Sequence, residues 1–420
     1  MSDTIYALSS GAPPAAIAVV RISGPDADAA LEALAGRLPE PRRAALRPLR
    51  RDGELLDHAL VLRFPGPASA TGEDLAELHL HGGRAVVAAV LAALAAVPGL
   101  RAAEPGEFTR RAFRNGRIDL AEAEGLADLL GAETETQRRA ALALAGGGLS
   151  RQVESWQARL LAAAADVEAR LDFDDEADVA GQGAGTAGAL AADLADEIEA
   201  WLARPSAERL RDGVRVAIAG PPNAGKSSLL NALVGREVAI VTKIAGTTRD
   251  LIEAPVAIGG IPFLLIDTAG LRDSEDPVEA IGVERARRSA AAADILLWLG
   301  PPDEAPPHAV RVHAKSDLGP GEGDVQLSAV TGAGLAALAA MLVDKARKLL
   351  PAEGEVALNA RHRAALSEAL NHLREAVSAD DLLIAAEALR LARAALDRVT
   401  GRAGVEDMLD ALFGRFCIGK

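Results

Sequence analysis

The 420-residue sequence predicts a multidomain fold that combines α/β and all-α parts. Changes in composition and hydrophobic periodicity along the chain support this prediction. Residues 1–118 mix short apolar runs with helical periodicity, and residues 212–351 alternate strand-like and helix-like segments. Residues 119–211 and 352–420 are rich in alanine and leucine at helical spacing. A helical sequence that is interrupted and then resumes predicts an inserted α/β domain whose two helical arms pack together.

The first segment has the apolar runs and the glycine and proline breaks that are typical of an α+β domain. Residues 15–24 (AAIAVVRISG) and 59–66 (ALVLRFPG) are apolar runs ended by glycine or proline, which predicts strands. Residues 84–97 (RAVVAAVLAALAAV) predict a helix that begins after two glycines.

The flanking segments read as helices with recognisable ends. Asp119 and Glu122 have the spacing of a capping box at a helix start. The acidic, glycine-rich residues 172–185 predict a solvated loop, a further helix is expected over residues 187–202, and long helix is expected from residue 361 to the chain end.

Composition limits the classes of function. The single cysteine excludes an intramolecular disulfide and is typical of a reducing compartment, and no signal or membrane-spanning segment is evident, so we expect a cytoplasmic protein. The formal charge of −15 does not favour generic binding of nucleic-acid phosphates. An RNA partner would therefore need a local basic patch or another protein.

Residues 214–227 carry the strongest signal in the chain. An apolar strand is followed by GPPNAGKS, which fits G-x-x-x-x-G-K-[ST], and a helix starts at Lys226. Glycines there let backbone N–H groups approach phosphates at the helix N-terminus. We expect Lys226 to reach the β- and γ-phosphates and Ser227 to ligate Mg²⁺, with Ala224, Gly225 and Ser228 lining the same loop. A chance glycine-rich turn is the alternative, and the motifs downstream argue against it.

Two further segments belong to a nucleotide switch. LLIDTAG ends an apolar strand at Asp267, which would hold Mg²⁺, and the Gly270 N–H would sense the γ-phosphate. AGTTRD (residues 245–250) lies where a first switch loop is expected, with Thr248 as a Mg²⁺ ligand. The plainer alternative for Asp267 is a strand-end cap.

The base is predicted to be guanine. In VHAKSD, Asp317 is placed to accept two hydrogen bonds from guanine N–H groups and Lys315 to pack over the ring. The backbone of Ser328 and Ala329 would meet the guanine carbonyl. Ala314 stands where GTPases usually have asparagine, so we expect weaker affinity with guanine choice retained.

Hydrolysis needs groups beyond Lys226 and Thr248. Leu271 follows D-x-x-G and cannot orient water, so Glu279 is the candidate that positions it. Asn223 offers an oxygen to a monovalent cation that would act in place of an arginine finger. The rest of that cation's shell would come from the backbone of Thr242 and Ile244 and from Thr247.

The chain resembles the MnmE (TrmE) family of GTPases that modify the wobble uridine of tRNA. The segments that carry the resemblance are GPPNAGKSSLLNALVGREVAIVTKIAGTTRDLIE, IDTAGLRDSEDPVEAIGVERA, VVRISGP, TGEDLAELHLHGG, EPGEFTRRAFRNGRIDLAEAEGLADLL and the terminal CIGK. The resemblance implies a Ras-like G domain at residues 212–351 within the helical domain, after an N-terminal domain at residues 1–118 that dimerises and binds folate.

The resemblance also implies the site residues and partners. Formyl- or methylene-tetrahydrofolate would be held by Arg21, Glu77, Arg117 and Lys420, where Arg117 replaces the family's lysine. G domains would dimerise with potassium held by Asn223, while Glu279 acts on water. A homodimer would join a flavoprotein resembling MnmG in a heterotetramer and modify carbon 5 of the uridine.

Some readings stay open. Cys417 is expected to be a buried small hydrophobe, with a reactive thiol as the alternative, and His79 with His81 are expected to make packing or polar contacts rather than bind metal. Rival functions are a ribosome-assembly GTPase, which should carry a basic RNA-binding domain, and a folate-dependent aminomethyltransferase that acts without a flavoprotein.

Overall fold

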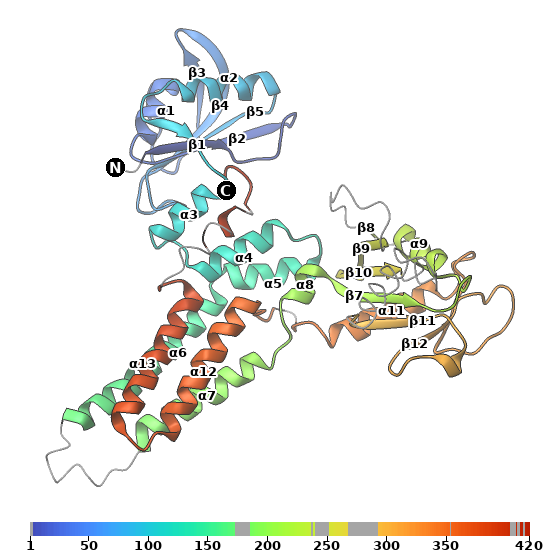
Figure 1. The fold of residues 1–420 in the computed structure, drawn as a ribbon. Helices are drawn as coiled ribbons and strands as arrows, with labels where there is room; N and C mark the ends of the chain where they lie inside the picture. The colour runs from blue at the N-terminus through green and yellow to red at the C-terminus, as the bar shows by residue number, and fades with distance from the viewer. Residues whose placement is uncertain are drawn as a thin grey trace, which may run out of the picture. The chain divides into compact units, whose positions relative to one another are not determined.

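The structure is a computed structural model in which the chain forms two compact units (Figure 1). One unit comprises Met1–Ala127 with Thr400–Lys420, and the other comprises Asp128–Val399. The structure describes residues 3–172, 185–236, 238–239, 252–267, 293–352, 354–403, 409, 412–414 and 416–420. Within these ranges no helix is both long and apolar enough to cross a membrane.

The first unit is built on a six-stranded sheet with the order β3-β4-β5-β2-β1-β6. Its strands are antiparallel apart from the parallel pair β1–β6. The strands are β1 (Thr4–Leu8), β2 (Ile17–Ser23), β3 (Ala45–Arg51), β4 (Glu54–Phe64), β5 (Leu75–His81) and β6 (Leu100–Ala102). The two strands expected from the sequence are confirmed as β2 and β4, although β4 begins five residues earlier than expected, at Glu54 rather than Ala59.

One face of this sheet is covered by α1 (Ala27–Ala35) and α2 (Arg84–Ala95), the second of which is the predicted helix. Alternate strand residues such as Val20 and Leu78 are fully buried against Leu31 and Leu94 of these helices. On the opposite face α3 (Glu107–Arg114) packs Phe108 onto the β1 end of the sheet. The other side of that face stays open, with Ile17, Leu46 and Leu60 exposed by 60%, 63% and 45%.

The chain end returns to the same unit. Gly401, in the left-handed region with φ +79°, ends α13 (Leu382–Thr400), and helical residues recur at 409, 412 and 413 among the described residues. Residues 416–420 are not helical, so the expectation of helix to the chain end is wrong for them. Ile418 bridges to Pro105, and a Cβ on Gly419 would lie 2.2 Å from the Leu8 carbonyl oxygen. The tail thus lies close against the end of strand β1, too close for a side chain at residue 419.

Helix α4 (Leu120–Leu130) starts as the sequence predicts. The Asp119 N–H donates to Glu122 Oε2 and the Glu122 N–H donates to Asp119 Oδ1, both at 2.8 Å. This reciprocal pair is a capping box, which satisfies two backbone donors at the helix start. Phe413 and Phe416 from the tail pack on Ala123 of the same helix.

The second unit contains a helical bundle (Figure 1). Its helices are α5 (Glu135–Ala145), α6 (Gly148–Asp172), α7 (Gly185–Leu202), α12 (Ala360–Ser378) and α13 (Leu382–Thr400). Arg374 of α12 pairs with Glu199 of α7 at 2.7 Å, and Gln157 of α6 donates to Asp397 of α13 at 2.7 Å. The helices before and after the inserted domain therefore pack together as predicted. Most of the expected loop at residues 172–185 lies outside the described residues.

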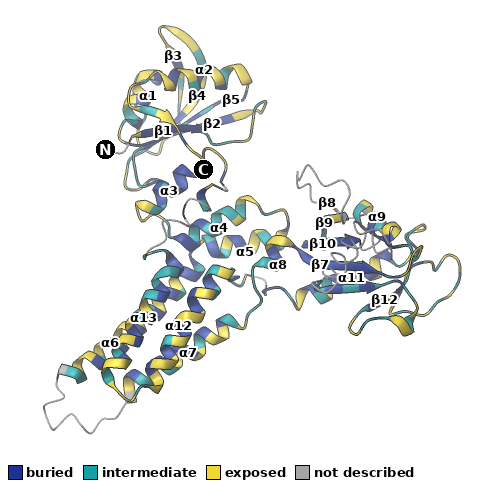
Figure 2. Ribbon diagram, in the orientation of Figure 1, coloured by how far each residue is buried: buried dark blue, intermediate teal, exposed yellow. Residues whose placement is uncertain are grey.

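The inserted α/β domain has a seven-stranded sheet with the order β13-β12-β11-β7-β10-β9-β8. Its elements are α8 (Glu208–Asp212), β7 (Val214–Ala219), α9 (Lys226–Arg236), β8 (Val238–Ala239), β9 (Ile252–Ile258), β10 (Ile261–Asp267), β11 (Ile295–Trp298), η1 (Pro302–Glu304), β12 (Val310–His313), β13 (Val325–Gln326) and α11 (Leu335–Arg347). Strands β7, β10, β11, β12 and β13 are parallel, and β7 and β10 are buried along almost their whole length (Figure 2). Loops at the carboxyl ends of such strands share one edge, where ligands of α/β sheets bind.

Candidate functional site

The loop between β7 and α9 has the backbone of a phosphate cradle. Gly220 and Gly225 adopt φ values of +147° and +98°, which side-chain-bearing residues rarely accept. A Cβ on Gly220 would also lie 3.0 Å from the Leu299 backbone carbon. Asn223 has φ +62°, a value that asparagine tolerates better than most residues. The loop can therefore curl closely at the N-terminus of α9, where backbone N–H groups favour anions.

Lys226 lies inside this loop. Its side chain is buried, and its Nζ donates to the carbonyl oxygens of Gly220 and Pro221, each at 2.8 Å. Burial lowers the pKa of the Lys226 ammonium, and the negative charge of Asp267 opposes that shift. A buried ammonium close to a carboxylate and aimed at carbonyls is suited to a ligand that brings negative charge.

Two oxygen-bearing side chains predicted to bind Mg²⁺ meet beside Lys226. Ser227 Oγ donates to Asp267 Oδ2 at 2.6 Å, and Asp267 is buried at the carboxyl end of β10. Strand register sets Asp267 opposite Ile218 of β7, so the strand end and the loop are neighbours. A hydroxyl and a carboxylate at this spacing suit Mg²⁺, which prefers oxygen ligands at about 2.0–2.1 Å.

The loops that follow β12 and β13 are held to each other and to the phosphate loop. Lys315 and Ser328 form an isolated antiparallel β-bridge, and the Ser316 N–H donates to the Leu327 carbonyl at 3.0 Å. Lys315 Nζ donates to the Asn223 carbonyl at 2.8 Å. The buried Ser328 accepts a hydrogen bond from the Thr331 N–H through its hydroxyl, and Ala329 follows it. The predicted base-binding and phosphate-binding loops thus lie together.

Asp317 and Ala314 belong to the predicted base-binding loop. Asp317 is exposed, and no described residue forms a hydrogen bond or ion pair with its carboxylate. Ala314 is buried, and its Cβ would be 3.9 Å from a Cβ on Gly225, so it faces the phosphate loop. An asparagine there would extend a polar group toward that loop, whereas alanine makes only an apolar contact. The remaining predicted positions lie outside the described residues: Thr242, Ile244, Thr247, Thr248, Gly270, Leu271 and Glu279.

A second group of predicted residues lies on the open sheet face of the first unit. Arg21 and Glu77 are cross-strand partners, and Arg21 Nη2 and Nε lie 2.9 Å and 3.1 Å from Glu77 Oε1. His79 bonds the other carboxylate oxygen of Glu77 at 3.2 Å. Burial favours the neutral form of Glu77, but Arg21 and His79 outweigh it and lower the pKa of this carboxyl. The Arg21 guanidinium also lies 5.9 Å from the Phe108 ring centroid.

The other members of this predicted set are not joined to that pair. Arg117 Nε donates to the Ser69 carbonyl at 3.1 Å, and the Lys420 N–H donates to the Cys417 carbonyl at 3.2 Å. Among the described residues, no hydrogen bond or ion pair links Arg117 or Lys420 to Arg21 or Glu77. Cys417 is exposed, so the expectation of a buried small hydrophobe is wrong: the thiol lies on a tail whose phenylalanines occupy the core instead.

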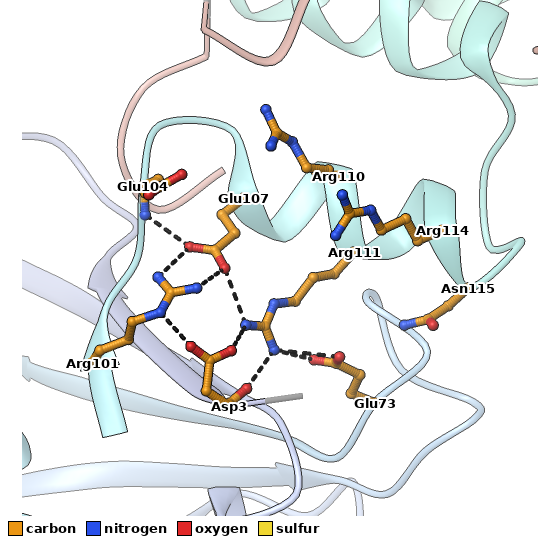
Figure 3. Close-up of a pocket in the computed structure, with 9 residues that line it drawn as sticks. All are labelled: Asp3, Glu73, Arg101, Glu104, Glu107, Arg110, Arg111, Arg114 and Asn115. Atoms are coloured by element: carbon orange, nitrogen blue, oxygen red, sulfur yellow. Dashed lines mark hydrogen bonds and ion pairs between the residues drawn. The ribbon is translucent and has the colours of Figure 1, made fainter. Parts of the chain in front are cut away.

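Sequence reasoning missed a charged cluster in the first unit (Figure 3). Arg111 Nη2 lies 2.8 Å from Asp3 and 3.0 Å from Glu107, and its Nη1 lies 3.1 Å from Glu73. Arg101 also pairs with both Asp3 and Glu107. The cluster borders a cavity of about 440 Å³ that is lined by Asp3, Glu73, Arg101, Glu104, Glu107, Arg110, Arg111, Arg114 and Asn115. Only the i, i+4 spacing of Glu107 and Arg111 could have signalled it.

Comparison with known proteins identifies relatives along the whole chain. Residues 4–117 match the family model described as the GTP-binding protein TrmE N-terminus, and residues 120–417 match that of the MnmE helical domain. The tRNA modification GTPase MnmE of Rhizorhabdus wittichii is 63% identical over 427 residues, covering 100% of this chain and 97% of the relative. The protein of the same description from Erythrobacter litoralis is 61% identical, covering 100% of both chains.

A solved structure also aligns with part of the chain. The G domain of the T. maritima FeoB iron transporter is 26% identical, covers 32% of this chain and 98% of that domain, and has a TM-score of 0.25. A score this low supports no inference about fold or function.

The charged cluster generates a pH prediction. Burial raises the pKa of Glu107, but hydrogen bonds from Arg101, the Glu104 backbone and Arg111 outweigh it, so the pKa is lowered in the folded state. A lowered folded pKa contributes stability above the unfolded value of about 4.3, and this contribution is lost as the pH falls. We expect Glu107→Gln to melt at a lower temperature than wild type at pH 7, with the gap in melting temperature narrowing as the pH falls below about 4.3.

Thermal melts of the full chain followed by circular dichroism across this pH range provide the measurement. Glu40→Gln is the control, because Glu40 and its partner Arg43 are 74% and 76% exposed and should contribute little to the pH slope. A melting temperature for Glu107→Gln that runs parallel to wild type at every pH would contradict the role of the cluster.

Proposed function

The chain belongs to the family of the tRNA modification GTPase MnmE, and from this premise we propose how its own residues hold GTP, hydrolyse it and support modification of carbon 5 of the wobble uridine. The observation that carries the proposal is the cluster of Lys226, Ser227 and Asp267 at the carboxyl ends of β7 and β10. A cation, a hydroxyl and a carboxylate side by side, in a loop built on glycines of positive φ, fit Mg²⁺ and a triphosphate.

Binding of GTP would use the two linked halves of the site. Lys226 and the backbone N–H groups of the loop, from Asn223 to Ser228, would meet the phosphates, while Ser227 and Asp267 would hold Mg²⁺. Ala224 and Gly225 belong to that loop. Thr248 would add a Mg²⁺ ligand and Gly270 an N–H toward the γ-phosphate.

Guanine choice would come from Asp317. Its carboxylate has no partner among the described residues, so it can accept both guanine N–H groups, and adenine would leave it desolvated and unsatisfied. Lys315 is held near the site by the Asn223 carbonyl, and the backbone of Ser328 and Ala329 would face the guanine carbonyl. Ala314 lacks the polar link that asparagine would make to the phosphate loop, which predicts a weaker affinity.

Hydrolysis would use Glu279 to position water, because Leu271 cannot. A potassium ion would supply the positive charge that an arginine finger supplies elsewhere. It would be held by the side-chain oxygen of Asn223, whose backbone carbonyl is already engaged by Lys315. The other members of the shell would be Thr242, Ile244 and Thr247, and the ion would favour association of two G domains.

The one-carbon unit would come from a tetrahydrofolate at the open sheet face of the first unit. The Arg21 guanidinium of the half-buried Arg21–Glu77 pair lies near the Phe108 ring, and the exposed Leu60 is the cross-strand partner of the neighbouring His79, which suits a flat ring with polar edges. Glu77 would accept from pterin N–H groups, and Arg21, Arg117 and Lys420 would meet the glutamate tail. The same apolar face would be covered in a homodimer, and an MnmG-like flavoprotein would complete a heterotetramer.

Lys226→Ala tests the nucleotide site. The ammonium is the one side-chain charge placed inside the phosphate loop, so its loss should lower GTP turnover by at least about 100-fold. Lys348→Ala is the matched control, since Lys348 is exposed at the C-terminal end of α11 and, among the described residues, forms its ion pair with Asp344. Phosphate release in Mg²⁺ and potassium gives the measurement, and turnover equal to wild type would refute the site.

Rates of GTP hydrolysis in potassium and in sodium separate the role of the monovalent cation from that of Glu279. Wild type should hydrolyse GTP faster in potassium than in sodium of equal concentration. Asn223→Gly should lose that difference, and glycine is the suitable replacement because it accepts φ +62° without strain.

Glu279→Ala should bind GTP nearly as wild type does but turn over more slowly in both salts. Equal wild-type rates in the two salts would remove the cation from the mechanism, and an unchanged rate for Glu279→Ala would remove the glutamate.

Glu77→Gln tests the folate site. Glutamine keeps the shape but loses the charge that balances Arg21 and accepts the pterin N–H groups, so affinity for 5-formyl-tetrahydrofolate should fall by at least about 10-fold. Calorimetry on the full chain measures it. Glu375 is an exposed glutamate of α12, and Glu375→Gln should bind 5-formyl-tetrahydrofolate as tightly as wild type does. The rate of GTP turnover should be unchanged in both variants. Undiminished folate binding by Glu77→Gln would move the site elsewhere.

A further inference from the structure

Strand β3 of the first unit and the residues that lead into it carry an unusual density of positive charge. Residues 42–51 contain five arginines and no acidic residue, in a chain whose formal charge is −15. We call Arg42, Arg43, Arg47, Arg50 and Arg51 the arginine edge, because β3 is the outermost strand of the six-stranded sheet. The hairpin of β3 and β4 is largely exposed (Figure 2).

Within the part of the chain that the structure describes, three of the five members of the arginine edge have no carboxylate partner. Arg42 donates to the Ala68 carbonyl, and Arg50 donates to the Gly53 carbonyl at 3.1 Å. Arg47 Nη1 donates to the neighbouring Leu46 carbonyl at 3.3 Å, and its buried Nε has no hydrogen-bond partner among the described residues. A guanidinium has five N–H donors, so each of these arginines keeps donors and full charge for a ligand.

The two members that do meet carboxylates form exposed pairs. Arg43 pairs with Glu40 at 2.8 Å, with both side chains about three-quarters exposed, and Arg51 lies 3.5 Å from Asp52, whose side chain is 91% exposed. Pairs this exposed are weak and exchange readily for another anion. The arginine edge therefore keeps a net positive charge despite Glu40 and Asp52.

Contacts with β4 and α2, together with the hairpin turn, hold the arginine edge in place. Arg42 lies across the Phe64 ring of β4, 5.7 Å from its centroid, and Arg51 donates to the Ala92 carbonyl of α2 at 3.0 Å. A two-residue turn at Asp52–Gly53, with φ values of +50° and +84°, closes the hairpin. The register shift between Leu49 and Arg50 is a β-bulge, a feature that redirects side chains at sheet edges. At about 3.3 Å per residue, Arg43 to Arg51 spans roughly 26 Å.

We propose that the arginine edge docks the phosphodiester backbone of the tRNA substrate through contacts that do not read sequence. The guanidinium fork matches phosphate oxygens in a bidentate manner, and a line of such groups follows a nucleic-acid strand. Because the chain as a whole is acidic and repels RNA, attraction has to be concentrated in a local patch of this kind. The proposal rests on the tRNA modification role of the family.

A competing explanation is protection of the sheet edge. Charged side chains on an outer strand prevent it from pairing with the edge of another molecule. Protection of the edge requires charged side chains, but it does not require guanidinium groups that lack carboxylate partners. It predicts a change of oligomeric state when the charge is removed, whereas tRNA docking predicts a change in salt-dependent binding.

The experiment compares full-length variants that carry three substitutions each. The test variant is Arg43→Gln with Arg47→Gln and Arg50→Gln, and a second variant has lysine at the same positions. The control replaces Arg139, Arg374 and Arg390, exposed arginines of the helical bundle, by glutamine, which changes the net charge equally. Binding of unmodified bulk tRNA is measured by fluorescence anisotropy across a range of salt concentrations.

We expect the glutamine variant to bind at least about 10-fold more weakly at low salt and to lose roughly 2–3 from the slope of log K against log salt, about 1 per phosphate contact. The lysine variant should keep most of the slope, and the control should match wild type. If the triple variant does not fold, Arg50→Gln alone should lose about 1 from the slope. GTP turnover, measured in the same samples, should be unchanged throughout.

Binding by the glutamine variant that equals wild type overturns the proposal. If that variant also oligomerises in light scattering, the edge serves protection, and if it instead loses its flavoprotein partner, the edge meets a protein. Absence of salt-dependent tRNA binding in wild type also overturns direct docking, while normal GTP turnover in that sample would leave the GTPase assignment intact.

Discussion

Parallel pairing of β10 with β7 sets Asp267 beside Ile218, and the candidate nucleotide site depends on this register. The pairing puts the end of one buried strand next to the loop that leaves the other, so that Ser227 reaches the Asp267 carboxylate at 2.6 Å. A slip of one residue would turn Asp267 to the opposite face of the sheet and separate the two oxygens. The strands are buried on both faces, through Val216 and Leu265 on one face and Ala217 and Ile266 on the other, and that burial is what fixes the register.

The same edge of the sheet gathers the rest of the site. Lys226 begins α9 directly after the loop, and the loop after β12 returns Lys315 to the Asn223 carbonyl. A buried ammonium and a buried carboxylate are costly to desolvate unless they are paired or meet a ligand of opposite charge. The arrangement is therefore best satisfied when phosphate oxygens and a divalent cation share the space between them.

Local features were predictable from the sequence, whereas contacts between distant residues were not. The strand, glycine loop and helix around Lys226 and the capping box of Asp119 with Glu122 follow from patterns shorter than about 20 residues. The cluster around Arg111 joins Asp3 and Glu73, which no local pattern relates to it. The exposure of Cys417 was missed for the same reason, since it depends on how Phe413 and Phe416 dock. The residues of the switch segments stay predictions.

Within the second unit, the nucleotide site is connected to the helical part through β10 itself. Thr136 Oγ1 at the start of α5 donates to the Gly260 carbonyl at 2.8 Å, in the turn that precedes β10, and Gln137 donates to the Leu210 carbonyl at 2.9 Å. From that turn, β10 runs without interruption to Asp267. The two points where the chain enters and leaves the inserted domain also lie together, because the Ala207 N–H donates to the Leu358 carbonyl at 3.0 Å. A change at Asp267, the proposed Mg²⁺ ligand, thus has a short path of buried strand to the helices, and the points where the chain enters and leaves the inserted domain are held together by a direct hydrogen bond.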